Sequence, residues 1–232
     1  MPTLSKQCLD KVASVLNNVK INLEAMPRQK TAAHAAYHHG ALRDALIEAT
    51  EAILAERGLE GFTLREAARR VDVSPAAPLH HFGSAAGLLT EVAILGFQAL
   101  TQYLRDGAQA GGNDPAARLR AQGLGYVRFA LAYPARFQLM FRKDRLTDDA
   151  RLLAAGQAAF AELETAIRGY TGFADGQPLD APTQALLLGA WSTVHGFAHL
   201  ALDGKFDVPG GPRADPQVLE ATLRRILEHG WP

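Results

Sequence analysis

Apolar residues recur at steps of three and four along most of the chain, which is the spacing of amphipathic helices. In the segment around residues 41–57, Leu42, Leu46, Ala49 and Ile53 share one helical face, and a glycine follows the last turn. Glycine just after a final turn is typical of a helix C-terminus, because it adopts the left-handed conformation without steric cost. The pattern therefore predicts a helix that ends beside Gly58.

From residue 86 onward every segment has helical rather than alternating periodicity. Breaks rich in glycine, proline and aspartate separate these segments at 111–115, 133–134, 143–148, 172–182 and 203–216. We expect one helix to stop before Pro134, a short one to end at Phe141, and two long ones to occupy about 180–203 and 214–229. The predicted fold class is all-α.

The stretch FTLREAARRVDVSPAAPLHHF predicts two short helices joined by a tight turn. Thr63 and Glu66 have the spacing of a capping box, in which each side chain bonds the backbone N–H of the other residue. Asp72 is placed to end the first helix, since aspartate tolerates the left-handed conformation. We expect Ser74 to cap the second helix and Pro75 to take its first position. Two such helices must cross steeply, as in the helix-turn-helix motif, whose second helix enters the major groove of DNA.

The first residues of that second helix are expected to approach base edges. Most of them have no hydrogen-bonding side chain, so readout would rest on thymine methyl groups and on DNA shape. His80 is interpreted as a phosphate contact, with a solvated polar residue as the alternative. Other contacts would fix the register on the DNA backbone. The predicted DNA-binding residues are Thr63, Arg65, Ser74, Pro75, Ala76, Ala77, Leu79, His80 and Ser84.

Over roughly residues 40–97 the chain resembles the TetR family of bacterial transcriptional regulators. The shared features are a threonine-capped helix, a small-residue turn, a Val-Ser pair and a short helix ending in an aromatic-His-Phe run. They appear here as Thr63, Ala68, Val73, Ser74, His81 and Phe82, followed by Leu88 and Leu89. The resemblance implies a three-helix DNA-binding head followed by a helical effector-binding and dimerisation bundle.

Three positions depart from the family pattern. Leu79 stands where a tyrosine usually hydrogen-bonds a phosphate, and Ala85 stands where a lysine usually touches the DNA backbone. Asp72 replaces the usual turn glycine. Because the first two changes remove a donor and a cation from the DNA face, we expect weaker or more salt-sensitive operator binding.

The C-terminal part resembles one subgroup of TetR-type effector domains, named for a Trp-His-Gly (WHG) motif. The similarity rests on a Phe-Ala helix, a Pro-x-x-Phe-x-x-Met-Phe turn and a helix carrying Trp191, His195 and Gly196. It extends the family match to about residue 205 and implies a homodimer formed through the last two long helices.

Helical bundles bind small molecules between helices, where a few polar groups converge in an apolar wall. A plain helical core is the alternative for most aromatic residues of this region. The predicted ligand-binding residues are Tyr126, Phe129, Phe137, Phe141, Trp191, His195 and His199. The two histidines lie one turn apart, but neither a His-Glu-x-x-His nor a Glu-x-x-His pattern accompanies them. We therefore predict no metal site and no cofactor.

Composition narrows the possible partners. The chain has 232 residues with 24 Lys and Arg against 24 Asp and Glu, which favours focused DNA contacts over a broad cationic face. Cys8 is the only cysteine, which fits a reducing cytoplasm. The uncharged run 185–202 raises the alternative of a membrane span, but its two histidines, Ser-Thr pair and two glycines favour a buried helix.

Three parts are expected: an N-terminal extension at 1–36, a helix-turn-helix domain at 37–97 and a ligand-binding and dimerisation domain at 98–232. The extension has helical apolar spacing at 4–25, and is either an extra helix or an overextended reading frame, with Met26 as a natural start.

The leading interpretation is a ligand-responsive transcriptional regulator of the cytoplasm. A homodimeric repressor would release a near-palindromic operator when a small molecule of unknown identity binds its C-terminal domain. The partners would then be double-stranded DNA, a second copy and the effector, with no membrane. The alternative is a helical regulator with weak DNA binding that acts through protein partners. An enzyme is not predicted, because the chain has no nucleophile elbow, phosphate-cradling glycine loop or dinucleotide fingerprint.

Overall fold

The computed structural model describes the backbone of residues 32–207 and 213–231, and their side chains from residue 41 onward. The chain divides into two compact units, residues 1–38 and 39–232, and nearly all described residues belong to the second. The extension expected at 1–36 lies, up to residue 31, outside the described part. Every regular element within the described ranges is a helix, which confirms the predicted all-α fold.

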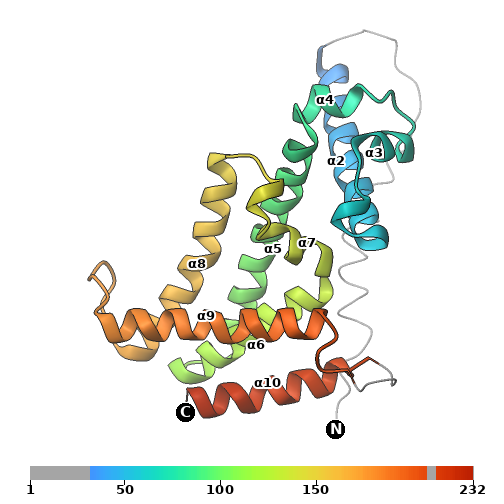
Figure 1. Ribbon diagram of the computed structural model, residues 1–232. Helices are drawn as coiled ribbons and strands as arrows, with labels where there is room; N and C mark the ends of the chain where they lie inside the picture. The colour runs from blue at the N-terminus through green and yellow to red at the C-terminus, as the bar shows by residue number, and fades with distance from the viewer. Residues whose placement is uncertain (1–31, 208–212, 232) are drawn as a thin grey trace, which may run out of the picture. The chain divides into compact units, whose positions relative to one another are not determined.

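The N-terminal head contains α2 (Ala32–Arg57), a 3-10 turn η1 (Leu59–Gly61), α3 (Leu64–Arg70) and α4 (Ala77–Phe82) (Figure 1). The helix α2 ends as predicted, with Gly58 at a φ of 68°. It begins further upstream than the apolar pattern alone indicated. The apolar faces of these helices pack into one continuous core with the helices that follow.

The capping box ahead of α3 is only half formed. The hydroxyl of Thr63 accepts from the Glu66 amide at 3.2 Å, as predicted. The capping box also predicts a bond from the Thr63 amide to the Glu66 carboxylate, and this part of the prediction is wrong. That carboxylate instead accepts two hydrogen bonds from Arg69, both at 2.8 Å, and one from Arg70. A bidentate guanidinium one turn away is the stronger partner for a carboxylate than a single amide.

The turn between α3 and α4 is longer than expected, because α3 ends at Arg70 and α4 starts at Ala77. Asp72 adopts the left-handed conformation with a φ of 55°, as predicted. The prediction that Ser74 caps the second helix and Pro75 opens it is wrong. The amide of Ala77 donates to the Ser74 carbonyl at 3.0 Å, so these residues form a β-turn and α4 starts at Ala77. Proline is favoured at the second position of such a turn, and Pro78 then stands in the first turn of α4.

One long helix, α5 (Ala85–Ala110), belongs to both the head and the rest of the structure (Figure 1). The hydroxyl of Ser84 caps it by accepting from the Gly87 amide at 2.9 Å. It packs closely on α6 (Pro115–Ala132) through Gly107. A Cβ atom added to Gly107 would lie 2.6 Å from the Ala121 carbonyl oxygen. Only glycine permits this approach of the two backbones.

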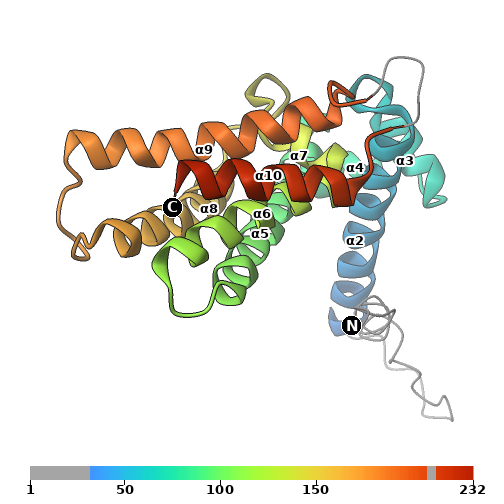
Figure 2. The same cartoon turned by 90° about the horizontal axis from the view of Figure 1, so that it is seen from below.

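The remaining helices surround α5 and α6. They are α7 (Pro134–Met140), the 3-10 turn η2 (Lys143–Arg145), α8 (Ala150–Thr171), α9 (Ala181–Leu202) and α10 (Pro216–Gly230). Helix α8 packs on α5, whereas α9 and α10 both pack on α6 and run side by side (Figure 2). The breaks between them coincide with the glycine- and proline-rich segments of the sequence, as predicted.

Helix α9 is less buried than expected. It is the one helix of the described residues that is long and apolar enough to cross a membrane by length and composition, with a mean hydropathy of 1.3. Only 28% of this apolar stretch is buried. Leu188 is 52% exposed and Leu200 is 46% exposed. The sequence predicted a buried helix, yet one face of α9 stays uncovered in the single chain.

Candidate DNA-binding surface and ligand cavity

The residues that precede and begin α4 point into solvent. Pro75 and Ala76 are exposed, and Leu79 is 49% exposed together with its neighbour His80. Pro78, in contrast, is buried. The buried face of α4 therefore carries Pro78, and its exposed face carries the residues predicted to contact DNA.

Around this outer face, Thr63 and Arg65 are also exposed at the start of α3. Arg65 has no ion pair to any residue in the described ranges, so its charge is available to a phosphate. Arg69 is held by Glu66, and the hydrogen bond from Arg69 is the main cause that lowers the pKa of the Glu66 carboxyl to about 2. The exposed Ser74 has a free hydroxyl within the described part of the chain, whereas the Ser84 hydroxyl is engaged in capping α5.

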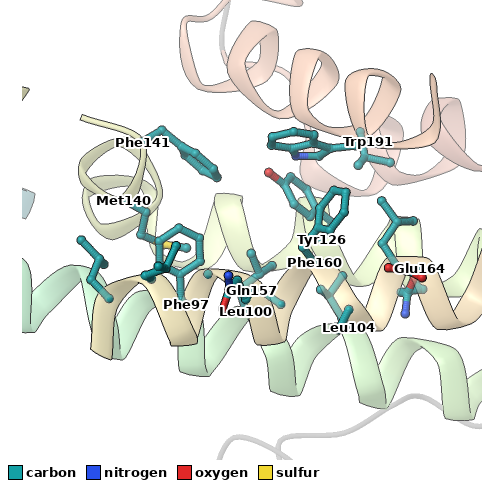
Figure 3. A pocket seen from close by; sticks show the side chains of 18 of the residues that line it. Phe97, Leu100, Leu104, Tyr126, Met140, Phe141, Gln157, Phe160, Glu164 and Trp191 are labelled. Carbon is teal, nitrogen blue, oxygen red and sulfur yellow. The ribbon is translucent and has the colours of Figure 1, made fainter. Parts of the chain in front are cut away.

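A cavity of about 1040 Å³ lies among α5, α6, α7, α8 and α9. Figure 3 shows it from close by, with Phe97, Met140 and Phe141 toward one end and Leu104 and Glu164 toward the other. Its walls are predominantly apolar. Such a volume is at the upper end of the range of small-molecule sites in proteins, roughly 300–1,000 Å³.

The structure brings together three of the seven predicted ligand-binding residues. Tyr126, Phe141 and Trp191 line the cavity (Figure 3). Phe129 and Phe137 do not, because both have no exposed surface and lie in the core.

His195 and His199 also lie outside the lining, with their rings 4.6 Å apart. His195 packs edge-on against Phe141, and His199 packs against Phe137. Within the described ranges no group of three or more His, Cys, Asp or Glu side chains is placed to hold a metal ion.

Several lining residues were missed from the sequence. Phe97, Leu100 and Leu104 come from α5, a helix assigned in its first half to the head, and Phe160 comes from α8. The apolar face of α5 continues well past the head, and this continuation could have indicated that α5 also contributes to the cavity. No local signal indicated Gln122, which lines the cavity from α6.

A polar network stands behind the aromatic wall. The hydroxyl of Tyr126 and Nδ1 of His195 are 2.7 Å apart. Burial raises the pKa of Tyr126 well above its usual value, against the smaller opposing effect of a hydrogen bond from Trp191. The phenol therefore keeps its proton, and its hydroxyl shares a hydrogen bond with Nδ1 of His195. Burial, and then the neighbouring His199, lower the pKa of His195.

A chain of contacts runs from the cavity to α4. Asp149, which lines the cavity, binds Arg151 at 2.7 Å, and Arg151 donates to one oxygen of Glu91 at 2.6 Å. Arg43 of α2 binds the other oxygen of Glu91. The guanidinium of Arg43 also lies 5.6 Å from the ring centroid of Phe82, the last residue of α4. Four side chains thus connect the cavity wall to the end of α4.

Further contacts tie the same wall to the head. The amide of Thr147 donates to the hydroxyl of Thr90 on α5 at 3.0 Å. Arg145 binds Glu60 of η1. Because Thr147 also lines the cavity, segment 143–151 is at once a wall of the cavity and a support of the head.

An exposed helix-turn-helix surface joined by a shared helix to a C-terminal helical domain is the arrangement of a DNA-binding transcriptional regulator. The chain belongs to the TetR family. The family described as "Bacterial regulatory proteins, tetR family" matches residues 46–92, and "Tetracyclin repressor-like, C-terminal domain" matches residues 119–226.

Solved structures share this fold. A protein of unknown function from Rhodococcus sp. RHA1 is 30% identical, with a TM-score of 0.68 over 84% of this chain and 96% of that one. The TetR family regulator PfmR from Thermus thermophilus shares 19% identity and a TM-score of 0.59 over 80% of this chain and 96% of that one. The ketosteroid transcriptional regulator KstR2 of Mycobacterium tuberculosis shares 21% identity and a TM-score of 0.56 over 81% and 93%. None of the curated proteins matches the chain in sequence.

Proposed function

We propose that this TetR-family regulator is a homodimeric repressor that leaves its operator when a small molecule occupies the cavity. The observation that carries the DNA-binding half of the proposal is the orientation of α4, which buries Pro78 and presents Pro75, Ala76, Leu79 and His80 to solvent. If these residues were packed against the protein core instead, α4 would have no exposed surface that could enter a major groove.

In this proposal Arg65, Thr63 and His80 contact phosphates, and the residues at 74–79 face the bases. Ser84 acts through the cap of α5, which fixes the spacing between α4 and the next helix. Readout by apolar side chains implies a thymine-rich operator or one with a distinctive shape.

Dimerisation through α9 and α10 is supported by their uncovered apolar side chains. Leu188 and Leu200 of α9 are exposed, as are Val218 and Ile226 of α10, at 60% and 41%. A monomer rarely leaves this much aliphatic surface on two adjacent helices in water. A symmetric dimer would hold two reading helices about one turn of DNA apart, which implies a near-palindromic operator.

The effector would act through segment 143–151. A ligand in the cavity contacts this segment, and Arg151, Glu91 and Arg43 connect it to the head. The ligand can shift the conformational equilibrium only by its different affinity for the two states. Any displacement of Asp149 or Arg151 on ligand binding therefore changes the support of α2 and α4.

Three finer assignments belong to the same proposal. The C-terminal domain is placed in the Trp-His-Gly subgroup on the basis of Trp191, His195 and Gly196. The domains are taken as 37–97 and 98–232, joined within α5. The protein is expected to work in the cytoplasm, where its DNA lies.

Selection of bound duplexes from a random pool by the purified full-length protein tests the proposal. We expect enrichment of one inverted repeat whose half-sites are about 10 base pairs apart, or a multiple of that spacing. Sequence-indifferent recovery at moderate salt would favour instead a regulator that acts through protein partners. A Leu79→Asp variant should lose the enrichment, because a carboxylate would enter the negative potential of the DNA groove.

A further inference from the structure

Resting on the proposed role of the cavity, we propose that the effector is an uncharged, largely apolar molecule with one hydrogen-bond donor. That donor, a hydroxyl or amide N–H, would bind the side-chain oxygen of Gln122. Most buried polar groups of the cavity wall already have hydrogen-bond or ion-pair partners within the protein, and the Gln122 oxygen does not.

Each charged side chain of the cavity wall either forms an ion pair within the protein or is exposed to solvent. Asp149 is paired with Arg151 and also caps α8 through the Arg151 amide at 2.7 Å. Glu164 is paired with Arg168 at 2.6 Å. The remaining two charged lining residues are exposed and of opposite sign, Lys143 and Asp148. Since burying an unpaired ion is costly, this wall suits neither an anionic nor a cationic ligand.

The one hydroxyl of the aromatic wall is already hydrogen-bonded within the protein. The Tyr126 hydroxyl is hydrogen-bonded to Nδ1 of His195 at 2.7 Å, and the Trp191 indole beside it lowers the Tyr126 pKa against the larger effect of burial. In Figure 3 the Trp191 ring and the Tyr126 hydroxyl point toward one another above the cavity. These side chains therefore form an apolar, rigid surface against which a ligand packs, and they do not anchor a polar group.

Gln122 is the exception among the buried polar residues of the wall. It is 2% exposed, and its side-chain nitrogen donates to the backbone carbonyl of Glu162 at 3.0 Å. A carbonyl can only accept, so the nitrogen must face Glu162 and the amide cannot be flipped. Its oxygen has no partner among the residues that the structure describes, and the side chain lines the cavity. Because this unpaired oxygen is not fully enclosed by protein, it can be reached from the cavity, and a donor on the ligand would satisfy it.

Both tryptophans of the chain, Trp191 and Trp231, line the cavity, so intrinsic fluorescence reports its occupancy. We would titrate the full-length protein with four probes of one chain length: 1-dodecanol, its methyl ether, dodecanoate and dodecyltrimethylammonium. The alcohol is expected to bind most tightly, about fivefold or more above the ether, as for one net hydrogen bond. Both ions are expected to bind more weakly than the ether.

Gln122→Leu is expected to abolish the difference between alcohol and ether without weakening the ether. If this variant fails to fold, Gln122→Met serves the same purpose. Gln157→Leu is the matched control, because Gln157 also lines the cavity but is exposed, and it should keep the difference.

Equal affinity of alcohol and ether for the wild type would overturn the role of Gln122. Tighter binding of either ion would overturn the uncharged class. Neither result touches the proposed repressor, whose operator selection is measured without ligand. A failure of all four probes to change the fluorescence would overturn the inference together with the effector role of the cavity. DNA selection would still decide the DNA-binding role separately.

Discussion

Arg43 of α2 and Arg151 of α8 bind opposite oxygens of the same carboxylate, that of Glu91. The side chain of Glu91 is only 12% exposed, whereas those of the two arginines are 37% and 61% exposed. One shielded anion therefore holds two cations that come from distant parts of the sequence. This arrangement lies between the cavity wall and the DNA-binding head.

Glu91→Gln is expected to destabilise the protein by about 1–2 kcal/mol, because Arg43 loses its charged partner and Arg151 keeps only Asp149. Urea unfolding measures the change. Glu48→Gln is the control, since Glu48 is exposed on α2 and should change stability by less than about 0.5 kcal/mol. Equal unfolding midpoints for the two variants would contradict the prediction.

Gly125→Ala is expected to destabilise the contact between α5 and α6. A Cβ atom at this position would lie 2.4 Å from the carbonyl oxygen of Tyr103, which belongs to the backbone and has no rotamer to change. We expect a loss of about 1–3 kcal/mol. Gly169→Ala, on α8 with nothing within 4 Å, should instead gain up to about 1 kcal/mol from helix propensity. A thermal melt of both proteins compares them directly.

Asp72→Gly and Asp72→Ala are expected to have opposite effects. Asp72 has a φ of 55°, which glycine adopts freely and alanine does not. The glycine variant should be as stable as the wild type or more stable, and the alanine variant less stable by about 1 kcal/mol. Denaturant midpoints decide the order; an alanine variant as stable as the glycine variant would refute it.

Leu79→Tyr and Ala85→Lys are each expected to strengthen DNA binding several-fold. Both positions are exposed on the proposed DNA face, and the substitutions restore the phosphate donor and the cation usual in the family. Fluorescence anisotropy at a series of salt concentrations measures affinity. Ala85→Lys should also steepen the log–log salt dependence by about one unit. Ala154→Lys, exposed on α8, should leave both quantities unchanged if α4 is the DNA-binding element.

Acidification is expected to destabilise the protein partly through His195. Burial, followed by the charge of His199, lowers the pKa of His195 from the ordinary value of 6.5. The unfolded chain therefore binds a proton there more readily than the folded protein does. The stability from the neutral imidazole is complete above pH 6.5 and is lost as the pH falls toward the lowered pKa.

Melting temperatures between pH 8 and pH 5 should fall less steeply in His195→Gln than in the wild type. His229→Gln, a change of an exposed histidine on α10, should show the wild-type slope. An identical slope in all three proteins would argue against the role of His195.

Most of the helices were predictable because their signals are local. Gly58, the Thr63 cap and the Ser84 cap each act within one turn, and the apolar periodicity needs only the segment itself. The start of α4 was not predictable in the same way. Ser-Pro is common both at a helix cap and in a β-turn. In the structure the backbone hydrogen bond from Ala77 to Ser74 shows that it forms a β-turn.

The cavity was predictable only in part, because it is a property of packing. Aromatic spacing indicated Tyr126, Phe141 and Trp191, but it indicated Phe129 and Phe137 just as strongly. The neighbouring helices determine whether a given face of a helix lines the cavity or packs in the core. The Glu91 contacts escaped prediction for the same reason, since their three residues come from three different helices.

The continuity of α5 constrains how such a regulator can be re-engineered. The same rod supplies Leu88 and Leu89 to the head and Phe97, Leu100 and Leu104 to the cavity. Each residue inserted into it would turn one half against the other by about 100°. Chimaeras that join this C-terminal domain to another DNA-binding head must therefore keep the helical phase across the junction, and a flexible spacer placed there would remove the fixed orientation of the two parts.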